Sequence, residues 1–207
     1  MLKIWFSRIS KKARWIIIAI IALFLISFGV FVFSPLSKVE VPPAFSQGRE
    51  EASKYAEEIV SAANEISANL KGIQTLEGDE KEKQALDIVI LQLQKNNESR
   101  QKAILLTEQL SKMTSAVPYI HPERAGRAAL EALSAETVLV QKLINYNDLL
   151  NQLLILIKDS LFEKSIDYDK MNKIIDDINR ETEEINGLNE KFLSLINDFD
   201  GYFGVSL

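Results

Sequence analysis

Residues 168–199, YDKMNKIIDDINRETEEINGLNEKFLSLINDF, carry the clearest structural pattern in the chain. Their large apolar side chains recur at steps of three, four or seven residues, which places them along one face of an α-helix. Asp167 precedes the run at the N-cap position, where a carboxylate accepts a hydrogen bond from a free backbone N–H. The predicted helix needs neighbours to cover an apolar face made of Met171, Ile174, Ile178, Ile185, Leu188, Phe192, Leu195 and Phe199.

Two similar patterns lie earlier in the chain. Residues 47–76 predict a first helix whose apolar face holds Tyr55, Ile59, Ala62, Ile66, Leu70 and Ile73. Asp79 and Glu82 resemble a capping box that opens a second helix, whose expected apolar face holds Leu86, Ile90, Leu93, Ile104, Leu110 and Met113. The polar stretch 94–102 interrupts this second face, and we favour a continuous helix with a solvated middle over a turn at Asn96–Asn97.

Pro118 and Pro122 mark the clearest interruption between these helices, because proline disfavours helical geometry in the residue before it. A further helix is expected over residues 123–162. Short connections between four long helices imply antiparallel neighbours. Residues 46–207 therefore predict an all-α fold, an antiparallel four-helix bundle with long, coiled-coil-like helices running up-down-up-down, and no strand is needed.

The N-terminal part has a different character. Residues 15–33, WIIIAIIALFLISFGVFVF, are almost entirely apolar and, at about 1.5 Å per residue, long enough to span a bilayer from Trp15 to Phe33. The basic arm 1–14 precedes them, so the positive-inside rule places the N-terminus in the cytoplasm and the bundle outside. The Pro-containing stretch 34–45 predicts a semi-stiff spacer. A cleaved signal peptide is the alternative, although the apolar run is long for one and no Ala-x-Ala site follows.

Charge and composition exclude several classes of function. Residues 1–14 contain five basic and no acidic residues, whereas the remainder contains 19 basic and 29 acidic residues. An acidic body does not favour nucleic acid as a partner, because that partner needs a concentrated positive field. The chain has no cysteine, which excludes disulfides and thiolate chemistry.

No pattern of residues points to catalysis. His121 is the only histidine, and it lies in the turn between two prolines. The acidic pairs lack the spacing of a calcium loop, and phosphate-binding or nucleophile motifs are absent from the sequence. We therefore expect no enzyme, no metal site and no cofactor.

Four polar residues indicate a possible binding layer. When the helices are aligned at mid-length, the expected faces bring Asn97, Tyr146 and Thr182 inward at a similar height, with Arg100 one turn from Asn97. Such a layer could bind a small polar ligand, with Arg100 holding a carboxylate. The alternative is that buried polar residues only fix the register of the helices.

The later half of the third helix and the chain end suggest an interaction surface. The run that includes Leu154, Ile155 and Leu156 is apolar on more than one face of the helix. The tail that contains Tyr202 and Phe203 is also unusually apolar, and it either docks on a partner or folds over its own bundle. These features favour a homo-oligomer or a cell-envelope protein partner.

The sequence therefore predicts a single-pass cell-membrane protein whose extracytoplasmic bundle acts as a structural or interaction module. No motif resembles a known family closely enough to name one. The alternative is a ligand-binding, sensor-type four-helix ectodomain that signals through a partner, because the cytoplasmic arm is too short to hold an output domain.

Overall fold

A computed structural model describes residues 41–73, 76, 80–163 and 167–203. These residues form four long helices, α3 (Pro43–Gly72), α4 (Lys81–Ala116), α5 (Glu123–Glu163) and α6 (Tyr168–Gly201), and the short 3-10 helix η2 (Val117–Tyr119). The described residues contain no strand. The predicted all-helical fold is confirmed.

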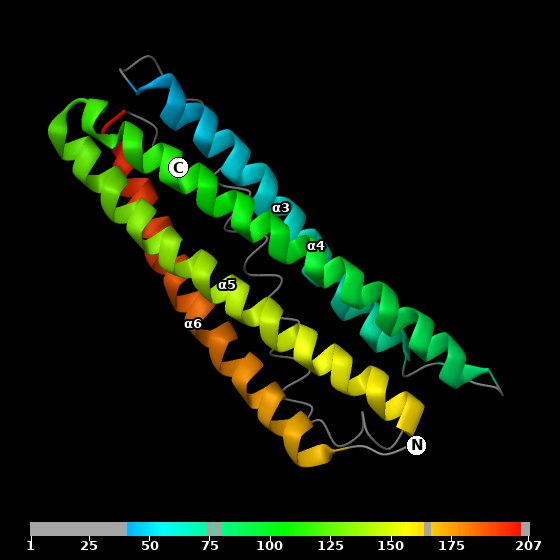
Figure 1. Ribbon diagram of the computed structural model, residues 1–207. Coiled ribbons are helices and arrows are strands. Elements are labelled where there is room, and N and C mark those ends of the chain that lie inside the picture. The colour runs from blue at the N-terminus through cyan, green and yellow to red at the C-terminus, as the bar shows by residue number, and fades with distance from the viewer. Residues whose placement is uncertain (1–40, 74–75, 77–79, 164–166, 204–207) are drawn as a thin grey trace.

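The helices run alternately up and down and form two antiparallel hairpins, α3 with α4 and α5 with α6 (Figure 1). The hairpins pack together through α4 and α5. We call the end where α3 and α5 begin and α4 and α6 finish the η2 end. It contains the turn between α4 and α5, where the His121–Pro122 peptide bond is cis, and the predicted interruption at the prolines is confirmed.

The helix boundaries follow local capping rules. The Asp167 side chain accepts a hydrogen bond from the backbone N–H of Lys170 at 2.9 Å, as expected for the N-cap of α6. The helix α3 begins at Pro43, inside the range assigned to the spacer, because proline fits the first position of a helix, where its missing N–H costs nothing. The N-cap of α4 is Glu80 and makes no side-chain capping bond, while Asp79 lies outside the described residues.

The stretch 94–102 is continuous helix, as we favoured, but the buried face of α4 is not the expected one. Ile90 is 50% exposed, whereas its neighbour Val89 is fully buried. Over residues 85–106 the buried face is displaced by one residue and consists mainly of small and polar side chains, Ala85, Val89, Gln92, Asn96, Ser99, Ala103 and Leu106. Toward the end of α4 the prediction is confirmed, since Leu110 and Met113 are buried as expected. Small side chains suit a helix that packs between two neighbours, since they allow a close approach.

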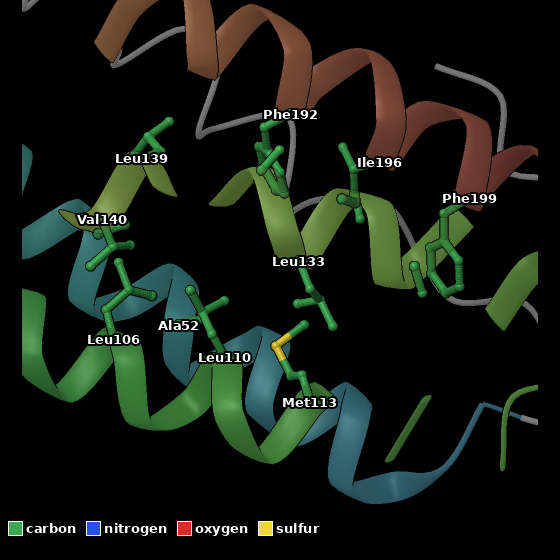
Figure 2. Close-up of a cluster of buried hydrophobic side chains, with 14 of the residues drawn as sticks. Ala52, Leu106, Leu110, Met113, Leu133, Leu139, Val140, Phe192, Ile196 and Phe199 are labelled. Atoms are coloured by element: carbon green, nitrogen blue, oxygen red, sulfur yellow. The ribbon is translucent and has the colours of Figure 1, made fainter. Parts of the chain in front are cut away.

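Two hydrophobic clusters fill the bundle. The larger cluster lies toward the η2 end and draws on all four helices. Figure 2 shows Ala52 of α3, Met113 of α4, Leu133 of α5 and Phe199 of α6 pointing into it. The smaller cluster fills the opposite half and contains Ile66, Ile73, Ala85, Val89, Leu150, Leu154, Ile157 and Met171. Burial of these apolar surfaces is the main force that holds the hairpins together.

None of the described helices has a stretch long and apolar enough to cross a membrane. The predicted span 15–33 and the basic arm 1–14 lie outside the described residues. The anchor therefore stays a prediction from the sequence.

Candidate functional site

A central polar layer separates the two hydrophobic clusters. It consists of the buried side chains Gln92, Asn96, Ser99, Asn147 and Thr182. The amide Nδ2 of Asn96 donates a hydrogen bond to the backbone oxygen of Asn147 at 2.7 Å, which joins α4 to α5. Asn147 in turn donates to the backbone oxygen of Leu143 at 2.9 Å. Because a buried amide has few alternative partners, the bond from Asn96 to Asn147 fixes the register between the two hairpins, while the bond from Asn147 to Leu143 satisfies the Asn147 amide within α5.

The structure brings together only part of the predicted layer. Thr182 is buried, as expected, and Tyr146 is half-buried and packs against both hydrophobic clusters. Burial raises the pKa of the Tyr146 hydroxyl to about 12. The prediction for Asn97 is wrong, since Asn97 is exposed and its neighbour Asn96 points inward, which is the same one-residue displacement seen along α4.

Arg100 does not belong to the central polar layer. Its Nε atom lies 2.7 Å from Oδ1 of Asp148, in an ion pair that crosses from α4 to α5 with both side chains partly exposed. The guanidinium is thus engaged at the surface and is not directed at a carboxylate in the interior. The structure thus pairs Arg100 with a carboxylate of its own chain, and its role in binding a ligand stays a prediction.

Two acceptors of the central layer have no hydrogen-bond partner among the described residues. They are Oε1 of Gln92 and Oδ1 of Asn96. The Gln92 amide nitrogen donates within its own helix, to the backbone oxygen of Ile88 at 3.3 Å. A buried acceptor without a partner costs about 1–3 kcal/mol, so each atom would gain from a donor supplied by a water or a small ligand.

A charged cluster lies inside the larger hydrophobic cluster and was not predicted. Nη1 and Nη2 of Arg49 lie 2.7 and 2.9 Å from the two carboxylate oxygens of Asp200, a bidentate ion pair that joins the beginning of α3 to the end of α6. Both side chains are almost completely buried. Phe45 and Phe199 pack beside this pair with their ring centroids 5.4 Å apart.

Glu136 completes the charged cluster from α5. Its side chain is 2% exposed, and its Oε1 atom has no hydrogen-bond partner among the described residues. Burial raises the pKa of this carboxyl to about 8, although the positive charge of Arg49 acts in the opposite direction. Glu136 is therefore largely protonated at neutral pH, which avoids a second negative charge beside Asp200.

The surface of the η2 end combines exposed aromatic and basic side chains. Tyr119 is 69% exposed and Tyr202 is 46% exposed. A pocket of about 510 Å³ lies between α5 and α6 at this end, and its lining includes Arg124, Arg127, Glu131, Asp198 and Tyr202. Within the described ranges, no three His, Cys, Asp or Glu side chains converge into a group that could hold a metal.

The predicted interaction surface is partly internal. Leu154 is fully buried, so its assignment to an interaction surface is wrong. Phe203 is buried with its ring 5.0 Å from that of Phe199, which agrees with the predicted alternative that the tail folds over its own bundle. Each is covered by the bundle itself, and at Phe203 the tail folds onto its own core. Leu156 is half-buried against the smaller cluster, while Ile155 is 38% exposed and Tyr202 is also exposed.

Helical periodicity places some of the remaining exposed apolar residues along one side of the α4–α5 pair. The Arg100–Asp148 ion pair lies on this side. Ile155 and Phe162 follow Asp148 by one and two heptads, and Leu93 precedes Arg100 by one heptad, so helical periodicity places them on the same side. We call Ile90, Leu93, Ile155 and Phe162 the α4–α5 strip; Ile90, Ile155 and Phe162 are exposed and Leu93 is half-buried.

Comparison with known proteins does not assign the chain to a family. No family model matches it, and no match was found among the curated proteins or the solved structures. The function must therefore be inferred from this chain's own residues.

Sequence reasoning missed the charged cluster, although part of it is visible in the pattern. Glu136 falls in phase with Leu133 and Val140 on the apolar face of α5, so a carboxylate at this position is unusual. The pairing of Arg49 with Asp200 spans 151 positions and has no local pattern that could reveal it.

Proposed function

We propose that the protein is a membrane-anchored, extracytoplasmic helical bundle that acts as a structural or interaction module, for scaffolding or assembly, and not as an enzyme. The observation that carries this proposal is the α4–α5 strip. The interior is filled by the bundle's own side chains, so the residues that remain for contact with other molecules lie on its surface. A rigid bundle that displays exposed isoleucine and phenylalanine along one side suits contact with another helix.

The membrane part of the proposal rests on the sequence. The apolar run 15–33, with five basic residues before it, supports an anchor whose N-terminus is cytoplasmic. Because the chain has no native cysteine, single cysteines at Ser10 and Ser61 report topology without background. In intact cells a membrane-impermeant thiol reagent should label the exposed position 61 and leave position 10 unlabelled. The reverse pattern would overturn the orientation.

The partner that we propose for the α4–α5 strip is a second copy of the chain. Anchoring confines copies to one plane and raises their local concentration, which lowers the entropic cost of pairing. A strip that runs along two adjacent antiparallel helices can pair with itself about a two-fold axis, as isologous interfaces do.

Self-association is tested by charge substitution on one face of α5. Ile155→Glu should weaken association of the full chain in detergent micelles by about tenfold or more, because it places a charge in an apolar contact. Val138→Glu is the matched control, since Val138 is also exposed on α5 but lies outside the strip. Sedimentation equilibrium over a range of protein concentrations measures both. A wild-type chain that is monomeric throughout would exclude a second copy as the partner.

A second candidate function is a ligand-binding sensor ectodomain, and the two unpartnered acceptors of the central polar layer favour it. A small molecule with hydrogen-bond donors would satisfy Gln92 and Asn96. Thermal denaturation of the full chain in the presence of amino acids tests this function. A rise in midpoint that is lost in Thr182→Val would support a ligand in the central layer, and no rise with any amino acid would count against it.

A further inference from the structure

The η2 end is the end of the bundle nearest to the predicted anchor. The first residue of α3 is Pro43, and Phe33 is the last residue of the predicted span. A chain extends by at most about 3.6 Å per residue, so the connection can hold the η2 end no more than roughly 35 Å from the bilayer. The opposite end lies at the other end of α5, which is 41 residues, or roughly 60 Å, long.

The side chains exposed at the η2 end have the chemistry of a membrane interface. Tyr119 stands out from the turn between α4 and α5, and Tyr202 lies at the end of α6. Tyrosine prefers the headgroup region, where its ring meets the acyl boundary and its hydroxyl meets water. Two arginines accompany these tyrosines, and arginine is well suited to contact phosphate.

The arginines are available for such a contact. Arg124 forms no salt bridge with any described residue, and Arg127 is paired only loosely, 3.6 Å from Glu123, with both side chains largely exposed. The pocket of about 510 Å³ is lined by both arginines together with Glu131 and Asp198. Neighbouring positive and negative groups are complementary to a zwitterionic headgroup, in which a phosphate and an ammonium are linked by a short chain.

We propose that the η2 end of the bundle lies on the outer surface of the anchoring membrane, with Tyr119 and Tyr202 at headgroup level and the Arg124–Arg127 pocket occupied by a zwitterionic phospholipid headgroup. The inference rests on the proposed anchor. It adds that the bundle stands on the bilayer and is not suspended above it by the spacer. The helices α4 and α5, which carry the α4–α5 strip, then run side by side away from the η2 end (Figure 1).

Fluorescence quenching in reconstituted vesicles tests this arrangement in the full chain. Single cysteines replace Tyr119 at the η2 end and Tyr168 at the opposite end, and each carries an environment-sensitive fluorophore. Both native side chains are exposed, so neither substitution disturbs the core. In vesicles of phosphatidylethanolamine and phosphatidylcholine that contain a headgroup nitroxide lipid, position 119 should lose most of its fluorescence and position 168 should lose almost none.

Charge reversal tests the pocket. Arg124→Glu with Arg127→Glu should sharply reduce quenching at position 119. Lys83→Glu with Lys173→Glu, which reverses two exposed lysines near the opposite end, should leave it unchanged. Equal quenching in both double variants would exclude the headgroup pocket.

A third fluorophore, at Leu25→Cys in the predicted span, separates the two levels of the proposal. Quenching at position 25 by acyl-chain nitroxides, together with none at position 119, would overturn contact of the η2 end with the bilayer and keep the anchor. Absence of quenching at both positions would overturn the anchor as well.

Discussion

The charged cluster and the central polar layer are both buried polar groups in an apolar bundle, yet they join different helices. The charged cluster connects the two outer elements, α3 and α6, through Arg49 and Asp200. The central layer is uncharged and connects the two inner elements, α4 and α5, through Asn96 and Asn147. At the η2 end, a charged pair joins the beginning of α3 to the end of α6. At mid-length, an uncharged amide bond fixes the register of α4 against α5.

The largest effect should follow from removing one member of the buried ion pair. Asp200→Ala deprives Arg49 of its bidentate partner and should lower the free energy of unfolding by about 3–5 kcal/mol. Urea denaturation of the full chain in detergent, followed by circular dichroism, measures the change. Replacing both residues by leucine is the control and should fall within about 1 kcal/mol of the wild type. A loss under about 1 kcal/mol for Asp200→Ala would mean that the pair contributes little.

The next effect depends on pH and concerns Glu136. Its pKa is about 8 in the folded state, against about 4.3 for an unfolded glutamate, so the folded protein holds a proton that the unfolded chain releases between these values. The free energy of unfolding should therefore fall by about 1.4 kcal/mol per pH unit from roughly pH 4 to pH 8 through this group. Glu136→Gln should remove this slope, with no gain near pH 4 and a gain of a few kcal/mol at pH 7.

Glu136→Asp is not a suitable control, because it would keep a titratable carboxyl group and create a cavity. Glu183→Gln serves instead, since Glu183 lies exposed on α6 and its neutralisation should change neither the slope nor the midpoint of unfolding. A Glu136→Gln profile parallel to that of the wild type would show that Glu136 is ionised in the folded protein at neutral pH.

The smallest expected effect concerns which face of α4 lines the central polar layer. Asn96→Ala removes the bond to the backbone oxygen of Asn147 and should lower the free energy of unfolding by about 1–2 kcal/mol. Asn97→Ala, one residue away on the exposed face, should stay within about 0.5 kcal/mol of the wild type. Chemical denaturation of the two variants side by side decides which asparagine faces the interior, and the opposite ranking would restore the face expected from the sequence.

The two helices α6 and α4 show what the sequence can and cannot predict. The buried face of α6 is lined by large residues such as Ile174, Ile185 and Phe192, which stand out from a polar background, and its phase and N-cap were predicted correctly. On α4 the largest apolar side chains are spread around the helix. In its first two thirds the buried face is formed mainly by Ala, Ser, Gln and Asn, which give little hydropathic contrast, so the predicted phase was wrong by one residue there, while Leu110 and Met113 near the end of the helix were placed correctly.

The predicted site residues show the same difference between α6 and α4. Thr182 was placed correctly because the phase of α6 was clear, and Asn97 was misplaced because that of α4 was not. The charged cluster depends on which helices become neighbours at the η2 end, and that information is distributed over the whole chain. The excess apolar surface expected on α5 is mostly covered by its own bundle, which only the packing of four helices could reveal.

The ion pair between Arg49 and Asp200 also has a consequence for the order of events during synthesis. Arg49 leaves the ribosome early, while Asp200 lies 151 positions later, so the α3–α4 hairpin is complete long before this contact can form. The first turns of α3 therefore acquire their bidentate partner only when the last turn of α6 has formed, so the charged cluster is one of the last parts of the bundle that can be completed.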